Sequence, residues 1–175
     1  MTAWLYTALV LLVTGARLIE LRVARRHARA SFARGGIEFG RTHYPFMVVL
    51  HAGLLVGCVG EVGLLDRPFL PWLGWPMLVL LIAAHALRWW CIRTLGQQWT
   101  TRVIVVPQAG LVTDGPYRYL RHPNYVAVVI EGFALPLIHT AWLTALIFTA
   151  LNAGLLIVRL RVEERALSML VPATR

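Results

Sequence analysis

The sequence predicts an all-α, polytopic membrane protein with about five transmembrane helices. Three observations support this class. The chain has 175 residues, of which 58% are hydrophobic and only 14% charged, whereas soluble domains carry about 25% charged residues. Long apolar runs recur along the chain, and arginines gather at their ends. A chain of this length is expected to form a single integrated domain, 1–175, without room for a separate soluble module.

The apolar runs define the expected helices. They cover roughly residues 2–19, 44–60, 71–90, 125–138 and 141–158. A bilayer crossing takes about 20 residues, with a range of about 17 to 25. The first, third and fifth runs meet this length, the second is marginal and the fourth is short. Pro136 is expected to end the fourth run, and His139-Thr140 to join it to the fifth in a tight helical hairpin.

The arginine distribution predicts how the chain is oriented in the membrane. The connection between the second and third runs carries few charges, whereas arginines follow the first, third and fifth runs: Arg22, Arg25, Arg26, Arg29, Arg34 and Arg41, then Arg93, Arg102, Arg118 and Arg121, then Arg159, Arg161 and Arg165. The positive-inside rule then places the N-terminus outside and the C-terminus in the cytoplasm. This orientation explains the net charge of +9 without nucleic acid. Because all 17 basic residues are arginine, we expect a GC-rich bacterial genome and hence a bacterial inner membrane.

A dense polar and aromatic segment, Gly115 to Tyr125, lies directly before the fourth run. Pro123 is favoured as the first residue of a helix, because its missing N–H would have no partner there. His122 is then near the N-cap, with Asn124 and Tyr125 in the first turn. The unpaired N–H groups and the helix dipole favour a carboxylate or phosphate at this point. The alternative is an ordinary helix start whose arginines anchor lipid phosphates.

A second polar segment, Arg159 to Arg165, directly follows the fifth run. Arg159 and Glu163 are four residues apart, so they share one face of a continuing helix. The simpler interpretation is an ion pair on a solvated helix, worth about 0.3 to 0.5 kcal/mol. However, Glu163-Glu164 is the densest acidic pair in a chain with only 8 acidic residues. A carboxylate beside the bilayer suits an ammonium, a ribose hydroxyl or an adenine amine.

Together the two segments resemble the isoprenylcysteine carboxyl methyltransferase family. The resemblance rests on Gly-Pro-Tyr followed by Arg-His-Pro-Asn-Tyr at 115–125, and on Arg-x-x-x-Glu-Glu-x-x-Leu at 159–167, around a short hairpin. It covers mainly residues 93–168, and related phospholipid methyltransferases and sterol reductases share this C-terminal architecture. We therefore divide the chain into an N-terminal three-helix membrane region, 1–92, and a methyltransferase-like cofactor-binding region, 93–175.

The resemblance implies an S-adenosylmethionine-dependent methyltransferase with its pocket at the cytoplasmic membrane boundary. By similarity, the cofactor would be lined by Gly110, Leu111, Val112 and Tyr117, held by His122, Pro123, Asn124 and Tyr125, and completed by Glu163. Arg159 would face the methyl acceptor, with Arg121 as a second orienting cation and His122 as the local base if one is needed. Where eukaryotic members often have His-Thr, this chain has Ala109-Gly110, so contacts there are expected through the backbone.

The methyl acceptor is expected to be lipophilic and to enter sideways between helices from the membrane lipids. We favour a phenolic or enolic hydroxyl of an alkyl polyketide, because bacteria generally lack protein prenylation and bacterial relatives are associated with such polyketides. One alternative is carboxyl methylation of an isoprenylated cysteine. Another is an NADPH-dependent membrane reductase of similar architecture, although we expect no extended tail beyond Leu170 of the kind sterol reductases use. A small transporter or assembly factor would spread polar residues through several runs.

The remaining polar residues in apolar runs are expected to be mostly structural. Two roles are possible for Glu131: it lines a substrate cavity, or it pairs with an arginine. We expect interhelical hydrogen bonds for His51 and for His85-Arg88, and a pair or snorkelling side chains for Arg17 and Glu20. Three further expectations concern residue classes: no metal site, because the histidines lack ligand spacing; buried free thiols at Cys58 and Cys91; and an interfacial belt of Trp72, Trp75, Trp89, Trp90 and Trp99.

Overall fold

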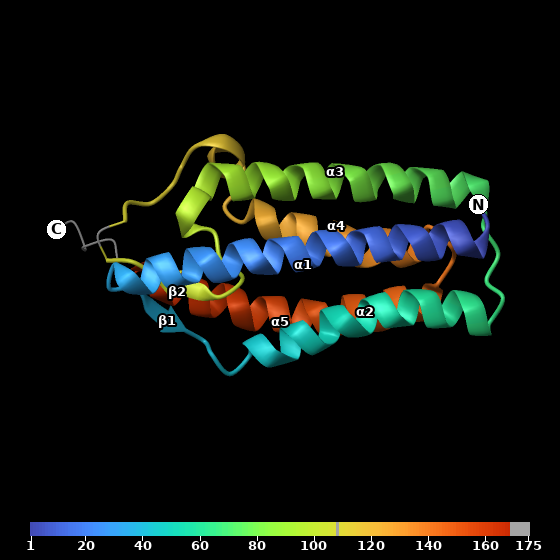
Figure 1. The fold of residues 1–175 in the computed structure, drawn as a ribbon, viewed down its shortest axis with the longest axis horizontal. Coiled ribbons are helices and arrows are strands. Elements are labelled where there is room, and N and C mark those ends of the chain that lie inside the picture. The colour runs from blue at the N-terminus through green and yellow to red at the C-terminus, as the bar shows by residue number, and fades with distance from the viewer. Residues whose placement is uncertain (108, 169–175) are drawn as a thin grey trace.

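The computed structural model describes residues 1–107 and 109–168 as a bundle of long helices running back and forth (Figure 1). The α-helices are α1 (Ala3–Ala33), α2 (Tyr44–Leu64), α3 (Pro71–Leu95), α4 (Pro123–Leu137) and α5 (Trp142–Ser168). The short elements are strands β1 (Ile37–Phe39) and β2 (Val103–Val105) and 3-10 helices η1 (Gly96–Gln98) and η2 (Gly115–Arg118). The predicted all-α polytopic class is confirmed. The expectation of no tail beyond Leu170 falls outside the described residues.

Four of the helices are long and apolar enough to cross a membrane, namely α1, α2, α3 with η1, and α5. The marginal second run becomes a helix of 21 residues. Helix α4 has 15 residues, which span about 22 Å at 1.5 Å per residue, less than the roughly 30 Å of hydrocarbon in a bilayer. In Figure 1 its amino end lies short of the ends of α1 and α5, so the segment before α4 enters the bundle.

Helix α1 continues far beyond the apolar run that ends near Ile19. The arginines between residues 22 and 29 therefore lie on helix rather than in a loop. Arginine, alanine and leucine have high helix propensity, and after Gly15 the next glycines come only at Gly35 and Gly36. Gly35 has a φ of +78°, and its N–H donates to the Phe32 carbonyl (3.0 Å). The helix ends there because glycine adopts this left-handed conformation without strain.

A two-stranded antiparallel sheet, which the sequence analysis did not expect, links two distant connections. Ile37 pairs with Val105 and Phe39 with Val103. Val103 and Val105 pack with Ala166 of α5 in a small hydrophobic cluster. The sheet therefore fastens the connection between α1 and α2 to the long connection between α3 and α4, beside the carboxyl end of α5.

The main hydrophobic core lies around the hairpin of α4 and α5, at the end of the bundle away from the sheet. Pro136 lies in the last turn of α4, and the Leu135 carbonyl accepts a hydrogen bond from the Tyr6 hydroxyl (3.1 Å). The hairpin connection is longer than the expected dipeptide, because residues 138–141 separate the helices. Within it, Thr140 has a φ of +53°, and its hydroxyl donates to the Pro68 carbonyl (2.6 Å).

A carboxylate from α2 caps the start of α5 in this core. The Glu61 side chain accepts hydrogen bonds from the backbone N–H groups of Leu143 (3.1 Å) and Thr144 (2.7 Å). Arg67 donates to the same carboxylate (3.0 Å). The first N–H groups of an α-helix have no partner within the helix, so Glu61 fixes where the hairpin places α5.

Buried charges between α1, α3 and α4 resolve the question of Glu131. The Arg17 Nε donates to Glu131 (3.0 Å), and Arg88 donates to it from α3 (2.9 Å). Arg17 also pairs with Glu20 one turn away. Glu131 thus pairs with arginines, and we name Arg17, Glu20, Arg88 and Glu131 the charged quartet. Two positive and two negative charges balance within it, as buried charges require.

The expected interhelical hydrogen bonds of the two histidines are not what the structure shows. The Nδ1 atoms of His51 and His85 lie 2.8 Å and 3.1 Å from the carbonyls of Met47 and Leu81, each within its own helix. An i−4 carbonyl lies within reach of such a ring on the same helical face. Cys58 and Cys91 are buried and free, which confirms the expected thiols.

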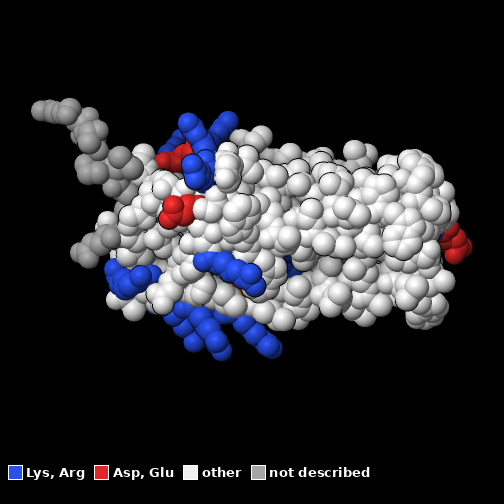
Figure 2. All heavy atoms as spheres, turned by 90° about the horizontal axis from the view of Figure 1, so that it is seen from above, with Lys and Arg blue, Asp and Glu red and all other residues white. Residues whose placement is uncertain are grey.

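Basic side chains gather at the sheet end of the molecule. Figure 2 shows them around that end, whereas the hairpin end shows an acidic group and almost no basic side chain on the visible face. The apolar flank between the two ends carries exposed leucine, isoleucine and valine side chains on α1, α2, α3 and α5. This is the surface that a bilayer requires.

Candidate functional site

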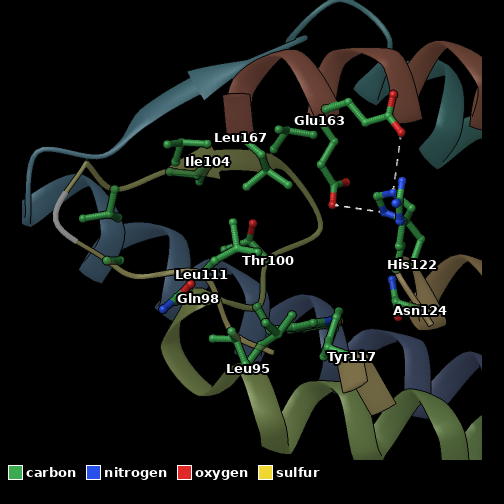
Figure 3. A pocket seen from close by; sticks show the side chains of 18 of the residues that line it. Leu95, Gln98, Thr100, Ile104, Leu111, Tyr117, His122, Asn124, Glu163 and Leu167 are labelled. Atoms are coloured by element: carbon green, nitrogen blue, oxygen red, sulfur yellow. Dashed lines mark ion pairs between the residues drawn. The ribbon is translucent and has the colours of Figure 1, made fainter. Parts of the chain in front are cut away.

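A cavity of about 590 Å³ opens at the basic end, where the chain between the end of α3 and the start of α4 meets the end of α5 (Figure 3). We name it the large cavity. Its walls come from the connection between α3 and η2, from the start of α4 and from the end of α5. The predicted site residues that line it are Gly110, Leu111, Val112, Tyr117, Arg121, His122, Asn124, Tyr125, Arg159 and Glu163. Pro123 alone among the predicted residues lies behind the wall, fully buried.

The start of α4 has the geometry expected from its sequence. Pro123 is the first helical residue and His122 the N-cap. The N–H groups of Tyr125 and Val126 donate to the His122 carbonyl (3.0 and 3.3 Å). The Asn124 Oδ1 is buried and has no hydrogen-bond partner among the described residues. A buried acceptor of this kind is usually satisfied, so Asn124 offers an oxygen to a donor on a ligand.

A single tyrosine joins the two polar segments across the cavity wall. The Arg159 Nε donates to the Tyr125 hydroxyl (2.8 Å), and that hydroxyl donates to the Glu163 carboxylate. The simpler interpretation of Arg159 and Glu163 as a direct ion pair is therefore wrong, because Tyr125 from α4 lies between them. Arg159 is only 7% exposed and also contacts the Met47 sulfur (3.0 Å).

The His122 ring lines the cavity beside two carboxylates. It stacks on the Tyr125 ring, with centroids 5.5 Å apart and planes at 17°. Its nitrogens lie 3.8 Å from Glu163 and 3.9 Å from Glu164 (Figure 3). The polar contact with Glu163 is the main cause that raises the pKa of His122 above its usual value, and the negative charges of both glutamates add to it against partial burial. The protonated form of His122 is favoured.

Tyr117 reaches the cavity from η2, which is held close to α3. Gly115 has a φ of +57°, and a Cβ at this position would lie 2.4 Å from the Thr94 Oγ1. Only glycine allows both this backbone conformation and this approach. Burial is the main cause that raises the pKa of Tyr117, so its hydroxyl stays protonated and can donate a hydrogen bond at neutral pH.

Several residues of the cavity were missed by the sequence analysis. They are Leu95, Gln98, Thr100, Val103, Ile104, Val105, Val106, Thr113 and Ser168. Gln98 donates to the Gly110 carbonyl (3.3 Å) and so holds the glycine in the wall. The four β-branched residues from Val103 to Val106 are typical of a strand and were a signal for β2. The partner strand, Ile37–Phe39, is too short to give a recognisable strand pattern in the sequence.

Trp99 was expected in the interfacial belt and is instead buried, with 3% exposure. It packs with Ala24 and Ile92, and its backbone carbonyl lies 2.9 Å from the His27 Nδ1. Trp72, Trp75 and Trp90 are exposed by 71%, 56% and 48%, consistent with a belt. Trp99 differs because the chain turns inward after η1 to line the cavity.

A second, small cavity of about 140 Å³ lies on the other side of the same wall. The two cavities share Trp99, Thr100, Asn124, Tyr125 and Arg159. The small cavity extends between α1, α2, α4 and α5 toward three members of the charged quartet, Arg17, Glu20 and Arg88. Arg159 and Tyr125 thus lie between a large polar cavity and a small one inside the bundle.

This fold and site define a polytopic helical membrane protein with a ligand-sized cavity at its basic end, next to its lipid-facing helices. Residues 77–169 match the sequence model of the isoprenylcysteine carboxyl methyltransferase (ICMT) family. The chain belongs to this family of methyltransferases. Its match includes both motifs and all the residues of α4 and α5.

Two bacterial proteins are similar over nearly the whole chain. The uncharacterized protein YpbQ of Bacillus subtilis is 36% identical over 165 residues, which cover 94% of this chain and 95% of YpbQ. An uncharacterized protein of Haemophilus influenzae is 29% identical over 159 residues, covering 89% and 91%. No solved structure matches the chain. Within residues 1–107 and 109–168, no cluster of three or more His, Cys, Asp or Glu side chains could hold a metal ion.

Proposed function

We propose that this protein is an S-adenosylmethionine-dependent O-methyltransferase that acts on a lipophilic acceptor in the membrane. The observation that supports this most is the meeting of the two family motifs in one cavity. The start of α4 and the end of α5 are joined there through Tyr125, which contacts both Arg159 and Glu163. Had these residues lain at opposite ends of the bundle, no single ligand could have touched both.

The large cavity suits the proposed cofactor in size and charge. Its volume of about 590 Å³ lies within the range of about 300 to 1,000 Å³ that is usual for small-molecule sites. The N-terminus of α4 and protonated His122 would attract the cofactor carboxylate. Glu163 and the tyrosine rings would hold its cationic groups, and the Asn124 Oδ1 would accept a hydrogen bond from an ammonium or adenine amine.

S-adenosylmethionine supplies an electrophilic methyl group when bound, and transfer to a hydroxyl yields S-adenosylhomocysteine, a methyl ether and a released proton. The buried Tyr125 and Arg159 exclude water from the wall where the acceptor would lie, and Arg159 would orient the acceptor oxygen. Arg121 is exposed at the rim and is less able to do so. The raised pKa of His122 keeps its ring cationic to a higher pH than a free imidazole, which makes it less available as a neutral base.

The acceptor that we favour is a phenolic or enolic hydroxyl of an alkyl polyketide. Both relatives found are bacterial, which supports an acceptor other than a prenylated eukaryotic protein. The description of the family favours a second candidate, the carboxylate of an isoprenylated cysteine. In both cases the apolar tail of the acceptor would lie among the lipids.

We also propose that the basic end faces the cytoplasm in a bacterial inner membrane, with the N-terminus outside. The concentration of arginine at this end supports that orientation, because cytoplasmic flanks carry the positive charge of membrane proteins. The cofactor cavity would then open to the compartment where S-adenosylmethionine is made.

Titration calorimetry of the full chain in detergent tests the proposed cofactor. S-adenosylhomocysteine should bind wild type, and Glu163→Ala should abolish binding because it removes the carboxylate that completes the cavity. Asp66→Asn, at the opposite end of the bundle, is the matched control and should bind like wild type. NADPH binding in place of S-adenosylhomocysteine would overturn the proposal and favour a reductase. Radiolabelled methyl transfer to an alkylresorcinol and to a farnesylated cysteine then separates the two acceptor classes.

A further inference from the structure

We infer that the outer side of the carboxyl-terminal part of α1 binds an anionic phospholipid. Four exposed arginines form this surface, and we name them the arginine stripe: Arg22, Arg25, Arg26 and Arg29. The occupant is a lipid whose head group carries a net negative charge, and in the proposed orientation it belongs to the cytoplasmic leaflet. This binding goes beyond the proposed methyl transfer and does not depend on it.

The arginine stripe lies on one side of α1. Its members are three or four residues apart or adjacent to such a pair, and residues at that spacing are neighbours on a helix. The opposite side of the same turns is committed to packing. Ala24 forms a cluster with Ile92 and Trp99, and the His27 Nδ1 lies 2.9 Å from the Trp99 carbonyl. These contacts fix the rotation of α1, so the stripe faces away from the bundle.

The stripe continues the lipid-facing side of α1 to the depth of the head groups. Trp4, Leu11 and Leu18 precede it at helical spacing and are exposed by 85%, 65% and 55%. Tryptophan favours the membrane interface. At 1.5 Å per residue, Arg22 lies about 27 Å and Arg29 about 38 Å from Trp4 along the helix axis. The hydrocarbon is about 30 Å thick and the whole bilayer about 40 to 45 Å, so the stripe crosses the head groups of the opposite leaflet.

No Asp or Glu side chain neutralises the stripe in the described part of the chain, which contains all 8 acidic residues. None of them is within ion-pair distance of the four arginines. Glu20, on the same helix, is 4% exposed and pairs with Arg17. By contrast, Arg41 pairs with Glu38 (2.9 Å). Four neighbouring cations without an acidic partner attract an anion to this surface.

A phospholipid is the anion that this depth of the membrane offers. Guanidinium groups bind phosphate oxygens through paired N–H donors, and the apolar stems of arginine can lie along the acyl chains. Clusters of about four to eight basic residues directly cytoplasmic of a membrane helix bind anionic lipids, and each residue contributes about 5-fold to the affinity. In a zwitterionic lipid the positive group cancels the phosphate charge, so the stripe selects a head group such as phosphatidylglycerol.

Thermal unfolding of the full chain in lipid nanodiscs tests this selection. Discs of phosphatidylcholine are compared with discs of equal parts phosphatidylcholine and phosphatidylglycerol that have the same acyl chains. A ligand of the native state raises the Tm, so wild type should unfold at a higher temperature in the mixed discs. The double variant Arg22→Gln/Arg26→Gln should lose most of this rise. Its Tm in phosphatidylcholine alone should equal that of wild type, because both side chains are exposed.

Native mass spectrometry of the protein in detergent, titrated with phosphatidylglycerol, measures the affinity directly. The double variant should raise the apparent Kd about 10-fold or more, given about 5-fold for each arginine. Arg22→Lys/Arg26→Lys keeps the charge and should retain most of the affinity.

The matched control is Arg34→Gln/Arg41→Gln, which removes the same net charge from the same end of the molecule. The Arg34 Nε donates to the Ala30 carbonyl (3.3 Å) beyond the stripe, and Arg41 pairs with Glu38. This variant should keep both the Tm rise and the Kd of wild type.

Three results would overturn the inference. They are an equal Tm rise in wild type and Arg22→Gln/Arg26→Gln, an equal loss in the control variant, and binding of an oligouridine RNA in preference to phosphatidylglycerol. The last would assign the stripe to nucleic acid. The proposed function is tested separately by binding of S-adenosylhomocysteine, because no member of the stripe lines either cavity.

Discussion

The Tyr125 hydroxyl oxygen lies 2.8 Å from the Arg159 Nε, on the helix that follows it in the hairpin. The same hydroxyl donates to Glu163 one turn further along α5. One phenol thus holds a cation on the side of the small cavity and a carboxylate on the side of the large one. This arrangement couples the two sites through a group that is 9% exposed.

Replacing Tyr125 with phenylalanine removes this bridge and keeps the ring that stacks on His122. Hydrogen bonds to charged groups are worth about 1.5 to 3 kcal/mol, and Glu163 would lose one of its fixed partners. We expect the Kd for S-adenosylhomocysteine to rise about 10-fold or more in titration calorimetry. Tyr119→Phe, whose side chain is 74% exposed, is the control. An unchanged Kd in Tyr125→Phe would show that Glu163 does not need this tyrosine.

Arg159→Ala should separate catalysis from cofactor binding. Arg159 contacts Tyr125 and Met47 at the shared wall, whereas Glu163 and Asn124 remain in place for the cofactor. We expect S-adenosylhomocysteine to bind within a few-fold of wild type, and kcat/KM for methyl transfer to fall about 100-fold, because the acceptor oxygen loses its orienting cation. Arg159→Lys should recover little, since lysine cannot reproduce the planar guanidinium. Lost cofactor affinity in Arg159→Ala would instead assign the arginine to the cofactor.

The sequence was sufficient for the apolar helices and for the parts of α4 and α5 that line the large cavity, for physical reasons. Apolar runs of bilayer length have no alternative to helix, and Pro123 marks a helix start through its own covalent structure. Arg159 and Glu163 share a face by helical spacing alone. The extension of α1 to Ala33 was not predicted from the apolar run, which ended near Ile19, although the helix propensity of the residues after it explains the extension.

Features that depend on contacts between distant segments could not be predicted from the sequence. The pairing of Ile37–Phe39 with Val103–Val105 joins segments whose short length gives no periodic signal. The quartet required α1, α3 and α4 to be packed before Glu131 could be assigned to Arg17 and Arg88. Trp99 looked like a belt residue until the turn after η1 placed it inside.

The contact between His122 and Glu163 predicts a pH-dependent stability. The pKa of His122 is raised in the folded protein by Glu163, whereas the unfolded value is about 6.5. The pair therefore stabilises the fold fully below that unfolded value, and this contribution is lost as pH rises through the folded value. His122→Gln should lower the Tm at about pH 5.5 and leave it unchanged at about pH 9. Equal differences at both pH values would mean that the charge of His122 does not stabilise the fold.

The proposed orientation can be tested with single cysteines on exposed positions at the two ends. Leu65 lies after α2 at the hairpin end and is 53% exposed, and Arg29 lies exposed on the basic end of α1. A membrane-impermeant maleimide should label Leu65→Cys in intact spheroplasts and Arg29→Cys only after permeabilisation. Wild type is the control, because Cys58 and Cys91 are buried. The reverse labelling pattern would invert the orientation.

Glu61→Ala should destabilise the protein without touching its site. The carboxylate accepts two backbone hydrogen bonds from the start of α5 and one from Arg67. Its removal leaves two helical N–H groups without partners in a largely apolar region, and comparable losses of a cap or of buried hydrogen bonds cost about 2 kcal/mol. We expect the Tm in detergent to fall by several degrees, with the Kd for S-adenosylhomocysteine unchanged below the transition, because the large cavity lies at the other end of the bundle.

Asp66→Asn is the matched control for this substitution, since Asp66 is exposed in the same connection and makes no contact with α5 among the hydrogen bonds and ion pairs of the described residues. Asp66→Asn should leave the Tm unchanged. Glu61→Gln keeps one acceptor oxygen and loses the charge, so its Tm should lie between those of wild type and Glu61→Ala. A Tm equal to wild type in Glu61→Ala would show that solvent caps α5 equally well. Weaker binding of S-adenosylhomocysteine by Glu61→Ala at an unchanged Tm would mean that the cap at the hairpin end sets the position of Arg159 and Glu163 at the other end of α5.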